Sequence, residues 1–222
     1  MAVQDASYRS STRTPFVIAS RKLKNMDAKQ FGVLFPKLYH LTFTSNLESI
    51  GLHGLQSCSD LAATLAFDAD EREASLNRRR LCIQSMRGAS LRDQQTASES
   101  KMKSCLVKIT APEWLTLLNS KVFFYLSLEK ALRFAEAYAD YENTILETDT
   151  CALLATHAPH ASVCRIQSGS FTFRATPRGR NSFIPLNSFV YKTRRDTPAE
   201  LSVDQPIREI LSFSRALKIA KP

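Results

Sequence analysis

The sequence lacks a long hydrophobic run, although 44% of its 222 residues are hydrophobic. No stretch approaches the ~20 apolar residues that a membrane-spanning helix needs, and no continuous apolar segment follows the charges near the N-terminus. We therefore expect no membrane partner and no secretion, and we predict a cytoplasmic protein. A chain of this length fits one main domain with a single sizeable core.

The sequence also lacks a pattern of structural or metal-binding cysteines. The five cysteines are odd in number, contain no C-x-x-C pair and have no histidine at metal-ligand spacing. We therefore expect no disulfide framework and no metal, and we predict small buried thiols in a reducing compartment. Glycine motifs that cradle nucleotides, G-x-G-x-x-G and the Walker loop, are absent as well, which argues against Rossmann and P-loop folds.

Acidic residues are in the minority. Thirty Lys and Arg residues stand against twenty-one Asp and Glu, and the formal net charge of +9 favours a polyanionic partner such as DNA or RNA. Residues 1–25 are rich in Ser, Thr, Arg and Lys, and we interpret them as a basic, flexible N-terminal arm. The arm either grips phosphate or has no role. Residues 26–222 form the single predicted domain.

The clearest local pattern begins at Pro36. An apolar strand over residues 38–42 is followed by Ser45 and Glu48 at capping-box spacing, and Gly54 is typical of a helix end. This pattern predicts a strand, a turn and a short helix, with His40 at the end of the strand. The alternative for His40 is an ordinary, partly buried histidine.

The remaining elements alternate between helical and extended patterns. We predict a helix over residues 59–80, a long loop over 84–104, and a helix over 112–119 that leads into a strand at 122–126. Ser127 is the expected cap of a helix that reaches about residue 140. Further strands are expected at 144–146, 162–166, 170–173, 183–186 and 199–203. Helices early and strands late indicate an α+β fold with antiparallel sheets.

Two segments resemble the DarT-type ADP-ribosyltransferases, a family of DNA-modifying toxins. Residues Tyr39-His40-Leu41-Thr42, Asn46-Leu47-x-x-Ile50 and Gly54-Leu55 look like the element that holds NAD in that family. Ala199-Glu200-Leu201-x-Val203 with Pro206-Ile207 is similar to the strand that carries its catalytic glutamate. The resemblance implies an ADP-ribosyltransferase-like fold, in which a split antiparallel β-sheet core is flanked by helices.

A closer resemblance carries no assigned activity. Most of residues 30–205 resembles an uncharacterised family of bacterial proteins, through Phe35-Pro36-x-Leu38-Tyr39-His40, Arg92-Asp93-Gln94, Glu113-Trp114-x-x-Leu117-Leu118-Asn119 and Val122-Phe123-Phe124. The sequence departs from the DarT pattern after its second strand, where Ser127-Leu128-Glu129-Lys130 replaces Pro-Met-Leu-Tyr. Acceptor specificity is the property that this departure affects most.

The resemblance to DarT assigns roles to individual residues. Glu200 is the expected catalytic carboxylate, which stabilises an oxocarbenium-like centre and helps to deprotonate the acceptor. His40 is expected to hydrogen-bond a ribose hydroxyl as a catalytic and NAD-binding residue, and an aromatic ring is expected to stack on nicotinamide. Asp204 and Glu209 are the competing candidates for the catalytic carboxylate. The alternative for Glu200 is a solvent-facing strand residue without a catalytic role. The full set of expected NAD-binding residues is His40, Leu41, Thr42, Asn46 and Phe124 or Tyr125.

Arginines mark the expected acceptor side. Arg79 and Arg92 are candidates for a catalytic arginine, and the alternative for the run at residues 78–80 is a solvated helix end. The expected nucleic-acid-binding residues are Arg78, Arg79, Arg80, Arg92, Arg178 and Arg180.

The leading hypothesis is mono-ADP-ribosyl transfer from NAD to a nucleic-acid base, with DNA ahead of RNA. Transfer to a protein or NAD hydrolysis is the second hypothesis. The third is a non-catalytic module that binds nucleic acid. The resemblance to toxins also implies a neutralising antitoxin.

Overall fold

A seven-stranded sheet organises the protein. The computed structural model describes residues 25–94, 99–171 and 176–219, so almost all of the predicted arm lies outside the described residues. Every pair of neighbouring strands is antiparallel. The order across the sheet is β7 (Phe183–Pro185), β6 (Ala161–Cys164), β8 (Glu200–Val203), β4 (Val122–Tyr125), β1 (Lys37–Phe43), β5 (Asn143–Asp149) and β9 (Ser214–Ile219).

The sheet splits between β1 and β4. Strand β1 pairs with β5 along its whole length, from Lys37 to Phe43. Against β4, in contrast, it shares the single Cα pair Tyr39 and Tyr125. The two strands therefore diverge beyond Tyr39, and the sheet consists of two halves that meet at one pair of residues. The mixed α/β architecture with an antiparallel sheet flanked by helices is confirmed.

Helices cover both faces of the sheet, and their starts follow local capping rules. Helix α7 (Leu128–Glu136) packs on one face through Ala131 and Ala135, and Ser127 caps it as predicted. Helices α1 (Ala28–Leu34) and α8 (Thr150–His157) cover the other face. Flanking helices are α2 (Leu47–His53), α5 (Glu99–Cys105) and α6 (Ala111–Asn119), and short 3-10 turns are Thr44–Asn46, Ala158–His160, Arg180–Ser182, Leu186–Ser188, Arg194–Asp196 and Ile210–Ser212.

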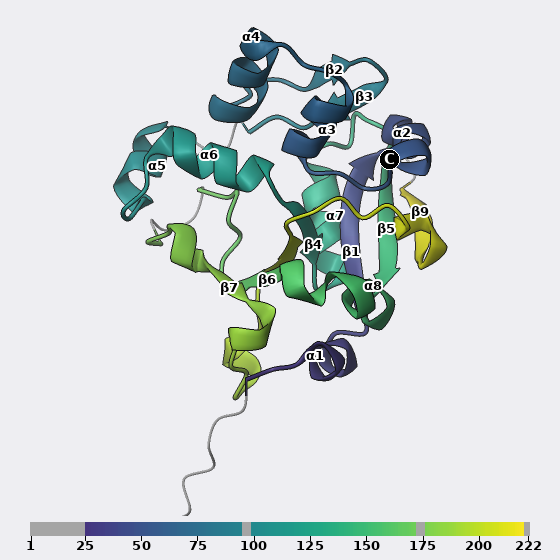
Figure 1. Ribbon diagram of the computed structural model, residues 1–222, viewed down its shortest axis with the longest axis vertical. Helices are drawn as coiled ribbons and strands as arrows, with labels where there is room; N and C mark the ends of the chain where they lie inside the picture. The colour runs from purple at the N-terminus through teal and green to yellow at the C-terminus, as the bar shows by residue number, and fades with distance from the viewer. Residues whose placement is uncertain (1–24, 95–98, 172–175, 220–222) are drawn as a thin grey trace, which may run out of the picture.

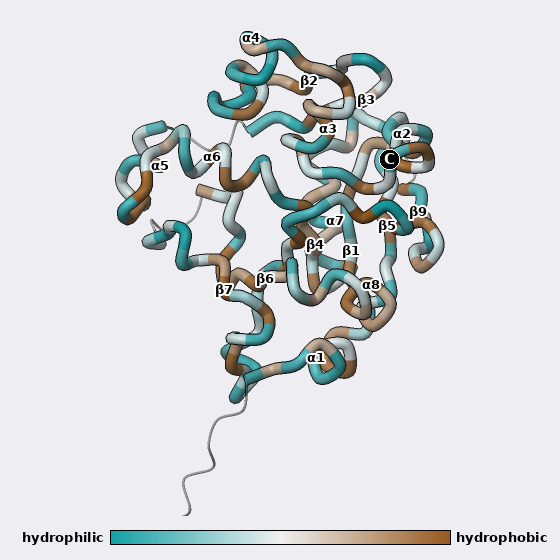
Figure 2. The backbone as a smooth tube through the Cα atoms, in the orientation of Figure 1, coloured by the Kyte–Doolittle hydropathy of each residue, from teal (hydrophilic) through white to brown (hydrophobic). Residues whose placement is uncertain are grey.

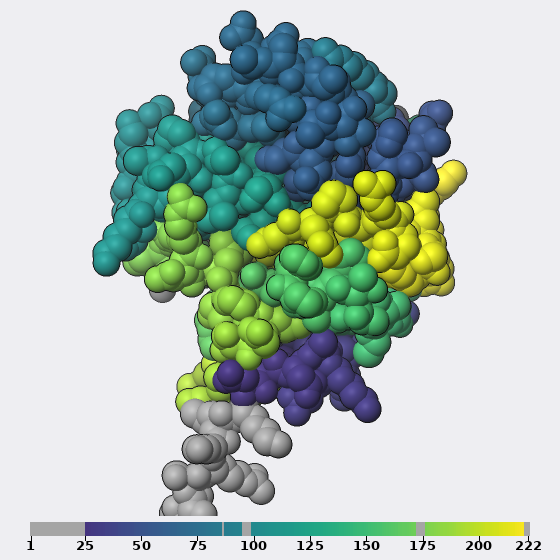
Figure 3. All heavy atoms as spheres, viewed as in Figure 1, coloured from purple at the N-terminus to yellow at the C-terminus, as the bar shows by residue number. Residues whose placement is uncertain are grey.

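A small lobe rises beyond the end of the sheet. It contains α3 (Cys58–Thr64), α4 (Ala69–Arg72), the π-helical turn Glu73–Asn77 and the hairpin of β2 (Gln84–Met86) and β3 (Ala89–Leu91). These elements lie together at the top of Figure 1 and form one blue mass in Figure 3. The lobe has its own apolar cluster, built from Ala62, Phe67, Leu76 and Leu91.

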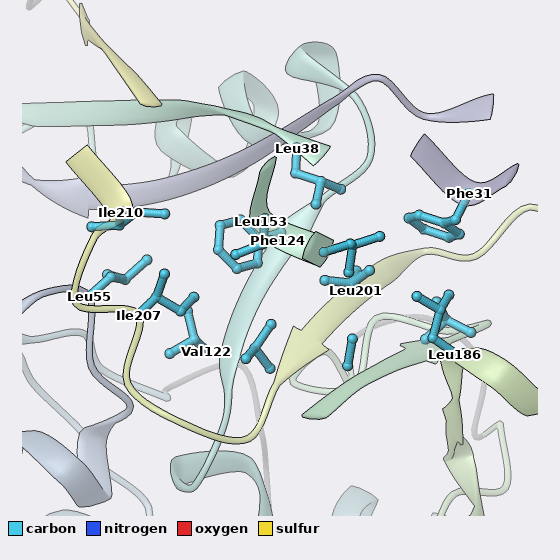
Figure 4. Close-up of a cluster of buried hydrophobic side chains, with 14 of the residues drawn as sticks. Phe31, Leu38, Leu55, Val122, Phe124, Leu153, Leu186, Leu201, Ile207 and Ile210 are labelled. Atoms are coloured by element: carbon cyan, nitrogen blue, oxygen red, sulfur yellow. The ribbon is translucent and has the colours of Figure 1, made fainter. Parts of the chain in front are cut away.

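The main core lies between the sheet and the α1–α8 layer. Figure 4 shows Phe124 of β4 among the side chains of Leu38, Leu153 and Leu201, which come from three other elements. A second cluster forms around Trp114 of α6, whose ring stacks on Phe183 at 5.7 Å. In Figure 2, hydrophobic residues alternate with hydrophilic ones along the chain. Among the described residues, no helix combines the length and the apolar character needed to cross a bilayer.

Several local predictions are wrong. The helix predicted over residues 59–80 breaks after α3, where Ala66 adopts a positive φ of 51°. The loop predicted over residues 84–104 contains the β2–β3 hairpin and α5. Ser45 lies within a 3-10 turn, and Asn46 begins α2 without a side-chain cap, so the capping box is absent.

Other predictions are confirmed or fall on residues that are not described. Helix α2 ends at Gly54, whose φ of 78° suits glycine. Helix α6, β4, β8 and the β5 and β7 strands lie where the patterns placed them. The strand expected at residues 170–173 is not formed at Ser170 and Phe171, and the rest of it lies outside the described residues. Helix α8 and strand β9 were not predicted from the sequence patterns.

Candidate functional site

A cavity of about 470 Å³ opens where β1 and β4 diverge. Its walls come from β1, β4, the start of β8, the segment between α2 and α3, strand β3 and the end of α7. His40, Arg92 and Glu200 all line it, although the sequence separates them by up to 160 positions. The split of the sheet therefore creates a concave site that gathers three of the four predicted catalytic residues.

The ring of His40 lies in the gap between the diverging strands. Its Nδ1 atom is 2.8 Å from the carbonyl oxygen of Phe123. Since a carbonyl can only accept, Nδ1 carries the proton and Nε2 presents a lone pair. Burial lowers the pKa of His40 to about 4, which outweighs the opposing effect of the Phe123 hydrogen bond. His40 is thus neutral at physiological pH, with Nε2 as a hydrogen-bond acceptor.

Glu200 lies at the first position of β8 and is 6% exposed. Burial raises the pKa of its carboxyl to about 7, against the lowering effects of Ser168, Arg178 and Lys130. The backbone N–H of Ser168 donates to Oε1 over 3.1 Å. Near neutral pH the carboxyl therefore populates both protonation states, a property that suits a general acid or base.

The two competitors of Glu200 are engaged elsewhere. Asp204 accepts from Lys121 at 2.6 Å, and Glu209 accepts from His157 at 2.8 Å. Neither side chain lines the cavity. Among the three carboxylates considered from the sequence, Glu200 alone reaches the site.

Arg92 enters the cavity with an incompletely paired guanidinium. Its plane lies over the rings of Phe43, at 4.0 Å, and Tyr138, at 4.5 Å. Nη2 donates to Oδ1 of Asn143 at 2.9 Å, whereas the buried Nη1 has no hydrogen-bond partner among the described residues. Burial lowers the pKa of Arg92 to about 10, so the guanidinium stays charged at neutral pH. A buried cation with an unpaired donor suits an anionic ligand group.

Asn46 and Thr42 line the cavity, but the amide of Asn46 is already used. Its Nδ2 donates to Thr42 Oγ1 at 3.2 Å and to Ser90 O at 3.0 Å, and its Oδ1 accepts from Ser90 N at 2.8 Å. Both amide hydrogens are consumed. These hydrogen bonds argue against NAD binding by Asn46. The residue instead links β1, through Thr42, to β3, through Ser90.

The two aromatic candidates separate clearly. Phe124 is completely buried in the main core, and its ring meets His40 edge-on at a centroid distance of 5.8 Å. Phe124 also lines the cavity, but a ring enclosed in this way offers little free face to nicotinamide, which argues against its predicted stacking role. Tyr125 points to the opposite face of β4, is half-buried and lines the cavity. It is the better-placed of the two.

Arg178 is an interior residue, which corrects its predicted contact with nucleic acid. It is 3% exposed and lies over the Phe171 ring at 4.2 Å. Its Nη1 donates to the carbonyls of Ser168 and Ser170, at 3.1 and 2.7 Å. Arg178 therefore holds the loop whose Ser168 N–H binds Glu200, and its burial argues against a contact with phosphate.

The other arginines also differ from the expectation. Arg80 is 5% exposed and donates to Ser75 O, Arg92 O and Asn119 Oδ1, so it fastens the lobe to α6 and is not a surface contact. Arg78 and Arg180 are exposed and form ion pairs with Glu73 and Glu113. Arg79 is half-buried and is absent from the cavity wall, which argues against catalysis.

The structure adds residues that the sequence patterns did not single out. Ser168 contacts Glu200, and Gln56 and Tyr138 line the cavity. Tyr138 donates to Asp93 at 2.7 Å. The Arg92-Asp93-Gln94 motif was the available signal for Asp93, whereas the other three depend on the tertiary arrangement.

The cysteines are only partly as expected. Cys105 and Cys164 are buried, Cys58 is half-buried, and Cys82 and Cys151 are exposed, which contradicts a uniform interior role. Among the described residues, no cluster of His, Cys, Asp and Glu has the arrangement of a metal site.

A family of unknown function, DUF7002, matches residues 36–214, which include the cavity-lining His40, Arg92 and Glu200. The chain belongs to the DUF7002 family. The matched region of this DUF7002 chain includes the small lobe and every strand of the sheet except β9, of which it reaches only the first residue. No curated protein and no solved structure matches the sequence.

Proposed function

We propose that the protein is an NAD-dependent mono-ADP-ribosyltransferase that modifies a nucleic-acid base, with DNA as the preferred acceptor. One observation carries the proposal: a neutral His40 and a Glu200 whose pKa lies near 7 line the same cavity. The resemblance of the His40 and Glu200 segments to DarT-type enzymes supplies the reaction class. NAD is the substrate, and no metal is required.

The chemistry assigns Glu200 two tasks. The bond between the ribose C1 atom and the nicotinamide nitrogen breaks, and its electron pair neutralises the pyridinium. A carboxylate near C1 stabilises the positive charge that develops on the ribose. A nitrogen of the acceptor base then bonds to C1, and the proton it loses passes to Glu200. Burial raises the pKa of Glu200 to about 7, which suits this transfer at neutral pH.

Other groups in the cavity bind the rest of NAD. His40 Nε2 accepts from a ribose hydroxyl, a bond that its neutral state permits. Continuing the β1–β4 register beyond Tyr39 would pair Leu41 with Phe123, but His40 occupies the Phe123 carbonyl. The main chain of Leu41 therefore borders the split and is available to the nicotinamide amide. Tyr125 offers a ring face, and the charged Arg92 takes a phosphate.

The acceptor is proposed from charge. The chain carries a formal net charge of +9, which attracts polyanions without selecting a sequence. The sequence resemblance to DNA-modifying toxins places DNA before RNA.

Mass spectrometry of separate DNA, RNA and protein pools after incubation with the purified protein and NAD tests this function. We expect an ADP-ribose adduct in the DNA pool, and its loss in Glu200→Gln. Glu129→Gln is the matched control, because Glu129 is an exposed carboxylate on α7 that pairs with Arg133. It should leave the adduct yield unchanged.

The other outcomes identify the alternatives. An adduct in the protein pool supports a protein acceptor, and free ADP-ribose without any adduct supports NAD hydrolysis. Salt-dependent oligonucleotide binding without nicotinamide release would overturn catalysis and leave a nucleic-acid-binding module.

A further inference from the structure

Gln56 lines the cavity and has a side-chain oxygen that is unpaired among the described residues. It lies between α2 and α3, and its Nε2 donates to Thr64 Oγ1 at 2.8 Å. Its buried Oε1 has no hydrogen-bond partner among the described residues. The glutamine at position 94 also lines the cavity, but its Oε1 accepts from Arg80 N at 3.2 Å. Gln56 therefore differs from Gln94 in having a free acceptor.

The backbone around Gln56 is fixed on both sides. Leu55 exchanges two backbone hydrogen bonds with Ile207, each 2.9 Å long, and Ser57 caps α3 through the N–H of Asp60. Gly54, with its φ of 78°, reverses the chain at a point where a Cβ atom would meet Arg208 Cα at 2.4 Å. The amide is thus held in place before any ligand binds, which reduces the entropy lost on binding.

The surroundings of Gln56 indicate what its oxygen recognises. Ile50, Leu55 and Leu61, which are close to Gln56 in sequence, also line the cavity and give this part of its wall apolar surface. Leaving a carbonyl unpaired in such a place is unfavourable, and a ligand donor removes that cost. A flat apolar ring with an N–H₂ group at its edge satisfies both features. Glutamine amides recognise adenine through this amine.

We infer that Gln56 recognises the exocyclic amine of the adenine base of NAD. The inference rests on the proposed function and adds to it a residue that selects the base. Hypoxanthine carries a carbonyl oxygen in place of the amine, so it would set an acceptor against Gln56 Oε1. The site therefore discriminates adenine from hypoxanthine dinucleotides.

Calorimetric titration with ADP-ribose and with its hypoxanthine analogue, inosine diphosphate ribose, tests the inference without turnover. We expect the wild type to bind ADP-ribose at least about tenfold more tightly than inosine diphosphate ribose. Gln56→Leu should weaken ADP-ribose binding and erase the difference between the two ligands. Gln56→Glu keeps an acceptor, to which the Thr64 hydroxyl can donate, and should retain the preference at pH 8. Gln30→Leu, which alters an exposed glutamine at the start of α1, is the control.

The outcomes separate the two proposals. Equal affinities in the wild type, or a preference for the hypoxanthine ligand through a rotated amide, overturn the role of Gln56 and leave NAD binding intact. Failure of the wild type to bind either ligand overturns the proposed function and this inference together. A folded Gln56→Leu protein that keeps the full preference also overturns the inference.

Discussion

Ser168 donates its backbone N–H to Oε1 of Glu200 over 3.1 Å. Arg178 holds the loop that contains Ser168, because its guanidinium donates to the carbonyl oxygens of Ser168 and Ser170. The hydrogen bond favours the charged carboxylate, yet burial dominates and leaves the pKa of Glu200 raised. The site thus retains a carboxyl group in surroundings that oppose its charge, at the expense of stability.

Glu200→Gln should stabilise the fold in a pH-dependent way. The folded-state pKa of about 7 lies above the ordinary value of 4.5, so the wild type is most stable when Glu200 is protonated. The stability of the wild type relative to Glu200→Gln is highest below about pH 4.5. It falls by on the order of 3 kcal/mol as the pH rises through 7. Urea unfolding of both proteins at pH 5 and pH 8 measures this. A stability difference that stays constant with pH would contradict the raised pKa.

Arg92→Gln should weaken ADP-ribose binding about tenfold or more, because the buried Nη1 is the proposed phosphate donor. Nicotinamide alone carries no phosphate, so its affinity should not change. Titration calorimetry with each ligand measures the effect. Arg78→Gln, at an exposed arginine paired with Glu73, is the control. Equal losses for both ligands would indicate a general disturbance of the cavity.

Arg178→Ala should destabilise the protein by about 3 kcal/mol, because three or more backbone carbonyls lose a buried charged donor. Arg180→Ala, two positions away but exposed, should change stability by less than about 0.5 kcal/mol. Urea unfolding curves at pH 7 compare the two variants. Equal losses of stability in the two variants would show that the buried position of Arg178 does not determine its contribution to stability. Arg178→Lys should recover little, since an ammonium cannot reproduce the planar donor fork.

Expression of the wild type in bacteria should arrest growth if the proposed transfer acts on DNA. Glu200→Gln should relieve the arrest, whereas Glu129→Gln should not, because the Glu129 side chain is 78% exposed and does not line the cavity. Colony counts after induction, with protein levels matched by immunoblot, provide the measurement. Arrest that persists in Glu200→Gln would remove the link between toxicity and this carboxylate. A neutralising antitoxin is proposed on the same basis.

The sequence predicted elements that depend on local rules. The Gly54 helix end, the Ser127 cap of α7 and the proline at the start of α6 are each decided within a few residues. The strands that contain His40 and Glu200 were also predicted, because each has a short extended pattern next to clear boundaries. The expected position of His40 at a strand end is wrong, since β1 continues to Phe43 and His40 lies at its middle. These elements contain the central residues of the candidate site.

The sequence could not predict features that depend on distant partners. The break at Ala66 and the folding of residues 84–104 into a hairpin and a helix follow from packing of the small lobe. Arg178 and Arg80 look like surface cations in sequence, but in the fold Arg178 donates to the carbonyls of Ser168 and Ser170, and Arg80 donates to Arg92 O and Asn119 Oδ1. Alternation separates Phe124 from Tyr125, yet only the tertiary arrangement shows which face is enclosed.

The split between β1 and β4 leaves the residues of β1 beyond Tyr39 beside the cavity, without a main-chain partner in β4. Main-chain groups are the same whichever side chain a residue carries, so a substitution at Leu41 that preserves the strand leaves its peptide groups in place. His40 lacks this tolerance, because its imidazole replaces a peptide donor at the Phe123 carbonyl. Along the diverging part of β1, therefore, most positions can change side chain without altering the peptide groups beside the cavity. His40 is the exception, because its side chain forms the hydrogen bond that joins β1 to β4 there.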